Sequence, residues 1–478
     1  MTELHSGEAR FGYLTSVIVL LGEDEVVLRK NALELRAEIE SRGFTARIES
    51  WNAMEAWLGS LPGNSKANVR RPLITTQNLP HLLPLSSVWP GSETCPCPFY
   101  PPGSPPLMMC TTDGSTPFRL NLHAGDLGHT LIFGPTGAGK STLLAIIAAQ
   151  FRRYPEATIF AFDKGMSMFP LCLGAGGDHY EIGGGADLAF APLHRIDESD
   201  EEFSWAAGWV ADLLTLQKVE VLPRHRNLIH EALMSLKEQP VHNRSLTDLN
   251  LRLMDNDLKM ALAHYTGNRP MGRLLDSKED NLSLSKFTVF EIERLMEMGT
   301  ENLIPVLTYI FRRIKKGLHG QPAMVILDEA WIMLGDPVFR GEIREWLKTM
   351  RKSNCIVVMA TQSLADAADS GIMHVLEESC PTKILLPNFQ ANSATQLPHY
   401  QGLNLNNTQI NLIRGGQPKQ DYYISNPGGN RLVQLALTRP QLAFVGSSGK
   451  DDIARIKVLH ETYGPQWPQR WLDEKLAG

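Results

Sequence analysis

The chain reads Gly134-Pro135-Thr136-Gly137-Ala138-Gly139-Lys140-Ser141 in the stretch that decides its fold. These residues match the pattern G-x-x-x-x-G-K-[ST], which requires a strand before the loop and a helix after it. The apolar run Thr130–Phe133 precedes the loop, and a helical pattern from Ser141 to about Arg153 follows it. The sequence therefore predicts a strand, a phosphate-binding loop and a helix, in that order.

The residue types of this loop suit the binding of a nucleoside triphosphate. Glycines let the backbone approach the ligand and aim several N–H groups at one point, where the helix N-terminus adds partial positive charge. Lys140 is expected to reach the β- and γ-phosphates, Ser141 to supply a hydroxyl to Mg²⁺, and Thr142 to lie near the α-phosphate or the base. The predicted nucleotide-binding residues are Gly134, Pro135, Thr136, Gly137, Ala138, Gly139, Lys140, Ser141 and Thr142.

The second half of the site is expected at an acidic strand end. Met324–Leu327 is an apolar run, and Asp328 and Glu329 follow it directly. Asp328 is expected to hold Mg²⁺ through water, and Glu329 to orient or deprotonate the attacking water. A glutamate here favours an ATPase over a kinase-like protein with the same loop. The sequence thus predicts hydrolysis of ATP, with ATP and Mg²⁺ as cofactors and with Lys140 and Glu329 as catalytic residues.

Two further catalytic residues are expected at opposite ends of the predicted strand Cys355–Thr361. Gln362 follows the strand and would face the γ-phosphate, where it could sense hydrolysis; a solvent-exposed strand end is the alternative. Arg351 precedes the strand and cannot easily reach the nucleotide of its own subunit. It is expected to act on a neighbouring subunit as an arginine finger, or else to lie on the surface at a helix C-terminus, where the helix dipole favours it.

Composition excludes several classes of protein. The chain has 478 residues, of which 43% are hydrophobic and 21% are charged, which is ordinary for a globular protein of two to four domains. The net charge of −6 shows no basic excess of the kind that accompanies a salt-driven grip on nucleic acid, although a local basic groove stays open as an alternative. The apolar run Tyr13–Leu21 is too short to span a bilayer, and Met1–Arg10 shows no signal-peptide pattern.

The cysteines indicate no disulfide framework. Six cysteines are too few for a disulfide scaffold in a chain of this length. Cys95 and Cys97 would need a second Cys/His pair to form a zinc site, and the sequence offers none at a suitable spacing. Reduced thiols are therefore expected.

The first 117 residues are expected to form two segments. Residues 1–60 read as a small α+β fragment with a βαβ order and a further short helix. The expected elements are a strand at Phe11–Leu21, a helix at Glu23–Ser41, a strand at Phe44–Glu49 and a helix near Trp51–Leu58. Residues 61–117 are rich in proline, which excludes a long helix or a sheet centre, and they are expected to be a linker.

Residues 118–196 and 277–478 are expected to form an α/β domain with a mainly parallel sheet. Its strands should be buried on both faces, because most of their apolar runs show no polar alternation. The candidate strands are Thr130–Phe133, Thr158–Asp163, Phe287–Ile292, Met324–Asp328, Cys355–Thr361 and Lys383–Leu386. Residues 197–276 lack this signal and repeat apolar residues at helical spacing, so they are expected to form an inserted all-helical subdomain.

Two groups of charged residues admit more than one interpretation. Asp163 and Lys164 end a predicted strand, where they either border the nucleotide site or form a simple turn. A basic cluster near the end of a predicted helix either is solvated, complementing the helix dipole, or contacts nucleic acid. The cluster consists of Arg312, Arg313, Lys315 and Lys316.

Several segments together resemble the TrbE-like ATPases of conjugative type IV secretion systems. They are Gly134–Thr142, Phe162-Asp163-Lys164-Gly165, Leu327-Asp328-Glu329-Ala330-Trp331, Arg351-Lys352-Ser353-Asn354, Ala360-Thr361-Gln362-Ser363, Asp421-Tyr422-Tyr423, and the closing segment from Leu442 through Trp467 and Trp471. The resemblance covers most of the chain from about Phe118 onward. Its most specific portion is the Asp-Glu-Ala-Trp segment followed by Ala-Thr-Gln-Ser.

The resemblance implies a RecA-like P-loop motor domain with a helical insertion, often assembled as a hexameric ring. It implies an energising role at the cytoplasmic base of a secretion channel, at the inner face of the bacterial inner membrane. The implied partners are channel subunits, a second secretion ATPase and a coupling protein. By motif match, nucleotide roles pass to Lys140, Ser141, Asp328, Glu329, Gln362 and Arg351. Members of the family carry a longer N-terminal half, and the residues before Phe118 resemble only the end of it.

The predicted function is therefore an ATP-hydrolysing motor of type IV secretion, and two alternatives stand beside it. A DNA-translocating ring ATPase of the coupling-protein or FtsK-like class would share the whole nucleotide site, but the net charge disfavours it. A structural scaffold that binds ATP without turnover would need neither Glu329 nor Gln362.

Overall fold

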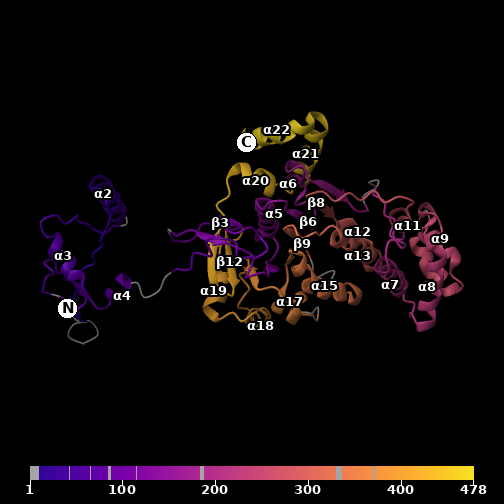
Figure 1. The fold of residues 1–478 in the computed structure, drawn as a ribbon, viewed down its shortest axis with the longest axis horizontal. Helices are drawn as coiled ribbons and strands as arrows, with labels where there is room; N and C mark the ends of the chain where they lie inside the picture. The colour runs from indigo at the N-terminus through magenta and orange to yellow at the C-terminus, as the bar shows by residue number, and fades with distance from the viewer. Residues whose placement is uncertain are drawn as a thin grey trace. The chain divides into compact units, whose positions relative to one another are not determined.

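The computed structural model describes residues 10–41, 43–64, 66–83, 88–114, 116–183, 188–267, 269–329, 336–369, 371 and 373–477. The chain divides into two compact units, Met1–Val88 and Trp89–Gly478, so the division lies within the predicted linker. Figure 1 shows the elements of each unit. Within the described residues, no helix combines the length and apolar character that crossing a membrane requires.

The first unit is a small α+β fragment, but its strands differ from those predicted. β1 (Phe11–Tyr13) pairs antiparallel with β2 (Leu73–Thr75), which comes from the proline-rich segment. The predicted strand Phe11–Leu21 is wrong beyond Tyr13, and Phe44–Glu49 forms no strand, so the βαβ order is wrong as well. None of the unit's described residues is buried. An alternation of apolar and polar residues favours a strand where one face of the strand is buried. The described residues of this unit offer no such buried face.

Three helices complete the first unit. They are α2 (Glu25–Ser41), α3 (Ala53–Ser60) and α4 (Leu79–Leu82). The predicted helices at Glu23–Ser41 and near Trp51–Leu58 correspond to α2 and α3, with starts two residues later.

A sheet of nine strands forms the centre of the second unit. In spatial order the strands are β13 (Gly429–Gln434), β12 (Asp421–Asn426), β11 (Thr382–Leu385), β5 (Thr130–Phe133), β10 (Cys355–Thr361), β9 (Ala323–Leu327), β6 (Thr158–Asp163), β8 (Phe287–Glu291) and β7 (Asp178–Glu181). All neighbours pair in parallel from β11 to β7, and only β12 and β13 add antiparallel pairs. The predicted α/β class with a mainly parallel sheet is confirmed, and the six predicted strands match to within one residue at each end.

Helices cover both faces of the sheet, as the unbroken apolar strands require. In β9, Met324 and Ile326 belong to one buried cluster, together with residues of α5 (Lys140–Phe151). Val325 and Leu327 belong to the opposite cluster, which includes residues of two helices. These helices are α13 (Thr300–Lys316) and α15 (Pro337–Thr349). The strand ends are thereby held by packing on both sides.

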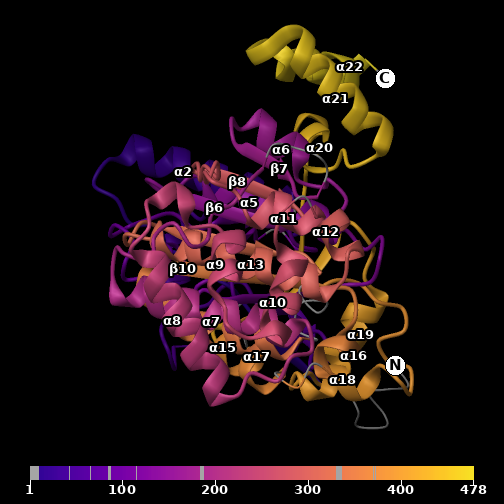
Figure 2. The same cartoon turned by 90° about the vertical axis from the view of Figure 1, so that its right-hand side faces the viewer.

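The remaining elements of the second unit surround this sandwich. Before the sheet lie β3 (Met108–Cys110) and β4 (Phe118–Leu120), which pair antiparallel. Around the sheet lie α6 (Phe169–Gly174), α12 (Glu293–Glu297), the 3-10 turn η3 (Met350–Ser353), α16 (Leu364–Asp369), α17 (Met373–Ser379), α18 (Leu397–Gly402) and α19 (Asn407–Gly415). The chain ends with α20 (Arg439–Val445), α21 (Lys450–Tyr463), η4 (Gly464–Gln466) and α22 (Trp467–Ala477). In Figure 2 these last helices lie at the top, next to α6.

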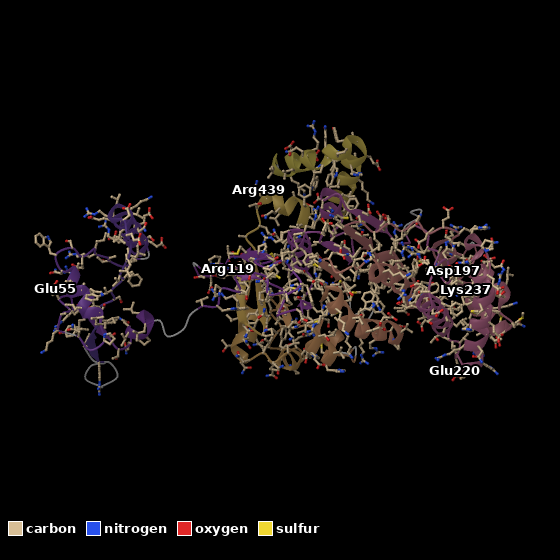
Figure 3. All side chains as sticks on the ribbon, viewed as in Figure 1. Glu55, Arg119, Asp197, Glu220, Lys237 and Arg439 are labelled. Atoms are coloured by element: carbon tan, nitrogen blue, oxygen red, sulfur yellow. The ribbon has the colours of Figure 1, made fainter. Side chains whose placement is uncertain are left out.

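The segment predicted as a helical insertion contains only helices and turns among its described residues. They are α7 (Asp200–Leu216), α8 (Pro223–Lys237), η1 (Val241–Asn243), α9 (Leu246–Arg252), α10 (Asn256–Leu262), η2 (Ala263–Tyr265) and α11 (Pro270–Leu275). Its buried residues are continuous with the cluster on the α13 face of the sheet. Figure 3 shows charged side chains such as Asp197, Glu220 and Lys237 on this region of the unit. The limits 197–276 remain a prediction.

The later half of the proline-rich segment is built into the second unit. Cys95, Cys97, Tyr100 and Cys110 are buried in the cluster on the α5 face. All six cysteines are free thiols, and burial raises the pKa of Cys95 and, to about 11, that of Cys97. Among the described residues, no group of three or more His, Cys, Asp or Glu side chains could hold a metal ion.

The basic cluster of α13 is paired within the protein. Arg312 donates to Glu202 and to Glu201 of α7, and Lys316 lies 2.8 Å from the same Glu202 carboxylate. Arg313 pairs with Asp280, and Lys315 lies 3.3 Å from Glu345. These contacts engage all four cations in pairs that link α13 to neighbouring segments, which argues against a nucleic-acid contact by this cluster.

We predict that Arg312→Ala lowers the apparent free energy of unfolding by about 3 kcal/mol, because Glu202 is buried and would lose one of its two cationic partners. The matched control, Lys315→Ala, removes an exposed pair and should cost less than about 1 kcal/mol. Urea unfolding followed by tryptophan fluorescence measures both, since Trp205 lies close to Arg312. Equal losses in the two variants would contradict the prediction.

Candidate functional site

The phosphate loop has the backbone that its glycines permit. Gly137 and Gly139 adopt left-handed conformations, with φ of 80° and 104°, which residues with a Cβ rarely adopt. The helix α5 starts at Lys140, directly after Gly139. The loop therefore ends with the exposed backbone N–H groups of a helix N-terminus, the arrangement that binds phosphate.

The segment before β12 contacts the phosphate loop directly. The backbone N–H of Lys419 donates to the carbonyl of Ala138 at 2.8 Å. A Cβ at Gly139 would lie 2.8 Å from the Tyr422 hydroxyl and 3.0 Å from Cα of Lys419. Glycine is thus required at 139 both for its φ and for this close approach. Sequence reasoning missed Lys419, because only the pairing of β12 at the sheet edge brings it to the loop.

The strand order brings the predicted acidic residues to the loop. β10 lies between β5, which leads into the loop, and β9, which ends before Asp328. Lys140 Nζ lies 3.0 Å from Asp328 Oδ1 and 2.5 Å from Glu329 Oε1. All three side chains are buried, with exposures of 8%, 3% and 3%. The lysine cation is therefore held between two buried carboxylates.

Glu329 reaches Lys140 because its backbone turns sharply. Its φ is 55°, a left-handed conformation that is unusual for a residue with a side chain and costs on the order of 1 kcal/mol. Its N–H donates to Asp328 Oδ1 at 3.0 Å, and the N–H of Asp328 donates to the carbonyl of Phe162 at 3.0 Å. Strain of this kind is concentrated at functional sites, where the surrounding structure holds it. Ala330 and Trp331, quoted for the family resemblance, lie outside the described residues.

Gln362 joins the loop to the Glu329 carboxylate. It follows β10, whose last residue, Thr361, pairs with Phe133, the last residue of β5. The hydroxyl of Thr136 donates to Gln362 Oε1 at 2.5 Å, and Gln362 Nε2 donates to Glu329 Oε1 at 2.5 Å. A continuous polar network therefore runs from the loop through Gln362 to Glu329 and Lys140.

Buried carboxylates lie close together at this sheet edge, and burial raises their pKa values. Burial raises the pKa of Asp328, and Lys140 opposes that shift. Burial and the nearby Glu291 raise the pKa of Asp163 to about 7. The Ser167 hydroxyl and the Met168 N–H both donate to Asp163. Asp163 is thus a buried structural group beside Asp328, and it holds the turn that leads into α6.

The other predicted site residues lie in two places. Ser141 and Thr142 are half-buried in the first turn of α5, next to Lys140. Arg351 lies in η3 at the opposite end of β10, where its guanidinium pairs with Asp126 at 2.6 Å. Seven residues of strand span about 20 Å. Arg351 is therefore separate from the nucleotide site of its own chain.

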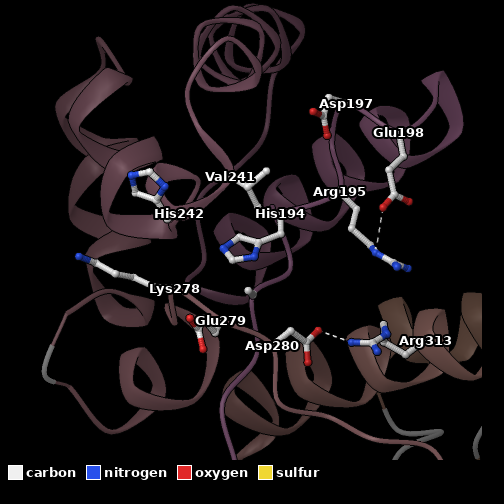
Figure 4. A pocket seen from close by; sticks show the side chains of 11 residues that line it. His194, Arg195, Asp197, Glu198, Val241, His242, Lys278, Glu279, Asp280 and Arg313 are labelled. Atoms are coloured by element: carbon white, nitrogen blue, oxygen red, sulfur yellow. Dashed lines mark hydrogen bonds and ion pairs between the residues drawn. The ribbon is translucent and has the colours of Figure 1, made fainter.

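A hollow of about 700 Å³ lies elsewhere, beside the helical segment (Figure 4). Five of its charged residues pair with one another or with a close neighbour: Arg195 with Glu198, Arg313 with Asp280, and Asp197 with the buried Arg244. It contains none of the predicted site residues. The phosphate loop and its acidic strand end are therefore the candidate site.

Two family models match portions of the chain. The model described as "CagE, TrbE, VirB family, component of type IV transporter system" matches residues 1–70. The model described as "TraG P-loop domain" matches residues 227–413, which include Glu329, Arg351 and Gln362 but not the phosphate loop itself. A solved structure, VirB4 of Thermoanaerobacter pseudethanolicus, superimposes with a TM-score of 0.58 at 14% identity, over 70% of this chain and 98% of that one. This likeness shows a shared fold.

Two relatives are much closer in sequence. The "Conjugal transfer protein TrbE" of Rhizobium radiobacter is 53% identical over 99% of this chain and 58% of its own length. The chain thus spans little more than half of that relative. A probable TrbE conjugal transfer protein of Sinorhizobium fredii is 54% identical over 97% of this chain and 70% of its own length. With this identity and coverage, the chain belongs to the TrbE family of conjugal transfer proteins.

Proposed function

We propose that the chain is an ATP-hydrolysing motor that energises conjugative transfer through a type IV secretion system. The observation that supports it best is the convergence of Lys140, Glu329 and Gln362 in one hydrogen-bonded network at the mouth of the phosphate loop. A protein that only bound ATP would need the loop and the lysine. It would not need a strained, buried glutamate beside them.

The proposed reaction begins when the triphosphate enters the loop. Its β- and γ-phosphates are bound by backbone N–H groups and by Lys140, which exchanges its carboxylate partners for phosphate oxygens. That exchange frees Glu329 to accept a proton from a water molecule. The water oxygen bonds to the γ-phosphorus, and the bond from the γ-phosphorus to the oxygen that bridges it to the β-phosphorus breaks. The products are ADP and phosphate. Gln362, already bonded to Glu329, lies where it can contact the γ-phosphate.

Mg²⁺ fits the residues proposed to hold it. The Ser141 hydroxyl and the Asp328 carboxylate are hard oxygen donors, the kind that Mg²⁺ prefers. Asp328 is buried and shares Lys140 with Glu329, so this edge of the sheet carries carboxylate charge that a cation would balance. When bound, the ion would neutralise charge on the phosphate oxygens.

Assembly into a hexameric ring would complete the site. In this proposal, Arg351 leaves Asp126 and contacts the γ-phosphate bound by a neighbouring subunit. Channel subunits, a second secretion ATPase and a coupling protein at the cytoplasmic face of the inner membrane are the proposed partners, because the chain's relatives carry the names of conjugal transfer proteins. DNA translocation is the weaker alternative, since the α13 cations are paired internally.

We predict that Lys140→Ala abolishes phosphate release and weakens ATP binding, because it removes the point charge on the β- and γ-phosphates. Steady-state phosphate release and calorimetric ATP titration measure the two effects. Circular dichroism serves as the fold control, because the substitution also leaves Asp328 and Glu329 without their shared cation. Turnover at the unaltered rate by this variant would refute the site assignment.

We predict that Glu329→Gln retains ATP binding and loses turnover by at least about a hundredfold, since an amide cannot accept a proton from water. ATP affinity and phosphate release are measured side by side. Glu342→Gln is the matched control, because Glu342 lies on α15 away from the network and should leave both quantities unchanged. A parallel loss of binding and turnover would make Glu329 a binding group instead.

We predict that Arg351→Ala lowers turnover by about 10³-fold or more, as loss of an arginine finger does. Arg351→Lys should be impaired as well, because lysine lacks the planar fork. Mixing tests whether the action is between subunits. Arg351→Ala and Lys140→Ala chains are each inactive alone. A mixed ring lets an intact loop meet an intact Arg351 from its neighbour, so a fraction of the activity should return. No recovery in rings shown to contain both chains would exclude action between subunits.

A further inference from the structure

A tight turn directly before β5, residues 123–129, carries the aspartate that pairs with Arg351. Its sequence is His123-Ala124-Gly125-Asp126-Leu127-Gly128-His129. Ala124 and Leu127 exchange both backbone hydrogen bonds, at 2.9 and 3.3 Å, and Gly125 has a left-handed φ of 63°. These contacts close a two-residue hairpin turn with Asp126 at its tip. We refer to residues 123–129 as the Asp126 turn.

The His129 imidazole fixes the Asp126 turn to the two elements that flank η3. Its Nε2 donates to the carbonyl of Leu347 in α15 at 3.0 Å, and its Nδ1 accepts from the N–H of Val357 in β10 at 2.9 Å. Burial lowers the pKa of this ring to about 4, so the ring is neutral and can both donate and accept. A Cβ at Gly128 would lie 2.5 Å from Ile356 Cγ2, so the base of the turn also touches β10 directly.

The backbone of η3 is held in place as well. Met350, its first residue, is buried. Asn354, which follows η3, is buried and left-handed, and its N–H donates to the carbonyl of Arg351 at 3.2 Å. The side-chain amide of Asn354 donates to the carbonyl of Gly320 at 3.0 Å. The backbones of Arg351 and Asp126 are therefore both fixed relative to β10, and their contact is made or broken by side-chain rotation.

The contact between Asp126 and Arg351 has the geometry in which arginine binds a phosphate oxygen. Arg351 Nε and Nη2 lie 2.7 and 2.6 Å from the same carboxylate oxygen, Asp126 Oδ2. The arginine side chain is 48% exposed and the aspartate side chain 32%, so another anion can approach the guanidinium. An exposed ion pair is weak, and a phosphate is a strong competing partner for a guanidinium. The arginine can therefore exchange the carboxylate for a phosphate.

We propose that Asp126 is an autoinhibitory partner of Arg351, which holds the guanidinium until a second copy of this chain presents the γ-phosphate of its bound nucleotide. The inference rests on the proposed function, because it concerns the same arginine finger. A neighbour with an empty phosphate loop offers no phosphate, so Arg351 then stays on Asp126. The exchange makes association between subunits depend on the nucleotide of the neighbour.

The first test measures turnover against protein concentration, because the proposed contact opposes association. Phosphate release at saturating Mg²⁺-ATP is followed for the unaltered chain, Asp126→Asn and Asp113→Asn. Asp126→Asn keeps the size of the side chain and removes its charge. The protein concentration that gives half-maximal turnover should fall about two- to fivefold. Asp113→Asn is the matched control, since it removes the same charge from an exposed partner of a different arginine, Arg431, and should leave that concentration unchanged.

The second test asks whether the effect passes through Arg351. Sedimentation velocity with Mg²⁺ and adenylyl-imidodiphosphate, an ATP analogue that is not hydrolysed, measures association of four chains: unaltered, Asp126→Asn, Arg351→Ala and the double variant. Asp126→Asn should promote association when Arg351 is present and should have no effect when Arg351 is replaced by alanine. Without the analogue, Asp126→Asn should have no effect in either background, because no phosphate then competes for the guanidinium.

The outcomes separate the autoinhibitory contact from the proposed function. An unchanged concentration dependence in Asp126→Asn, or a lower maximal rate, would overturn the role of Asp126; loss of turnover in Arg351→Ala would still support the arginine finger. An equal gain from Asp126→Asn with and without Arg351 would also overturn it, because the effect would then come from net charge alone. Full turnover by Arg351→Ala would refute the arginine finger and the role of Asp126 together.

Discussion

The site depends on one constraint, which is that parallel strands end at the same edge of a sheet. β5, β10 and β9 are adjacent and parallel, so the residues that follow them meet there. Gly134, Gln362 and Asp328 come from regions of the chain that are far apart in sequence. The hydrogen-bonded register and the helices packed on both faces fix their spacing. Lys140 is brought to this edge by the loop, and its ion pairs with Asp328 and Glu329 depend on that alignment.

The fold was predictable from the sequence where burial leaves a clear pattern. Strands covered on both faces are unbroken apolar runs, so β5, β6 and β10 match their predicted bounds. β7 was missed because Asp178–Glu181 is largely polar and pairs only with β8 at the sheet edge. The first unit was the least predictable region. Its described residues are not buried, so alternation of apolar residues there did not indicate a strand.

The sequence predicted which residues meet at the candidate site. It did not predict several of the contacts between them. The loop pattern and the acidic strand end identified Lys140, Asp328 and Glu329 without any structure. The direct ion pair between Lys140 and Glu329 was not foreseeable, because it requires the left-handed turn at Glu329. The bond from Thr136 to Gln362 likewise depends on how the loop folds over the end of β10. Lys419 has no motif, and only the pairing of β12 at the sheet edge brings it to the loop.

β10 connects two residues with proposed roles, Gln362 and Arg351, through one buried strand. Gln362 follows one end of this strand, and the turn that carries Arg351 precedes the other, with every residue of the strand buried between them. In a ring where Arg351 acts on the next subunit, the strand would transmit a shift at one of its ends to the other. A change that moves Gln362 at one nucleotide would displace Arg351 at the neighbouring one. Because the two ends are chemically different, such a signal has a direction, and hydrolysis would pass around the ring in one rotational sense.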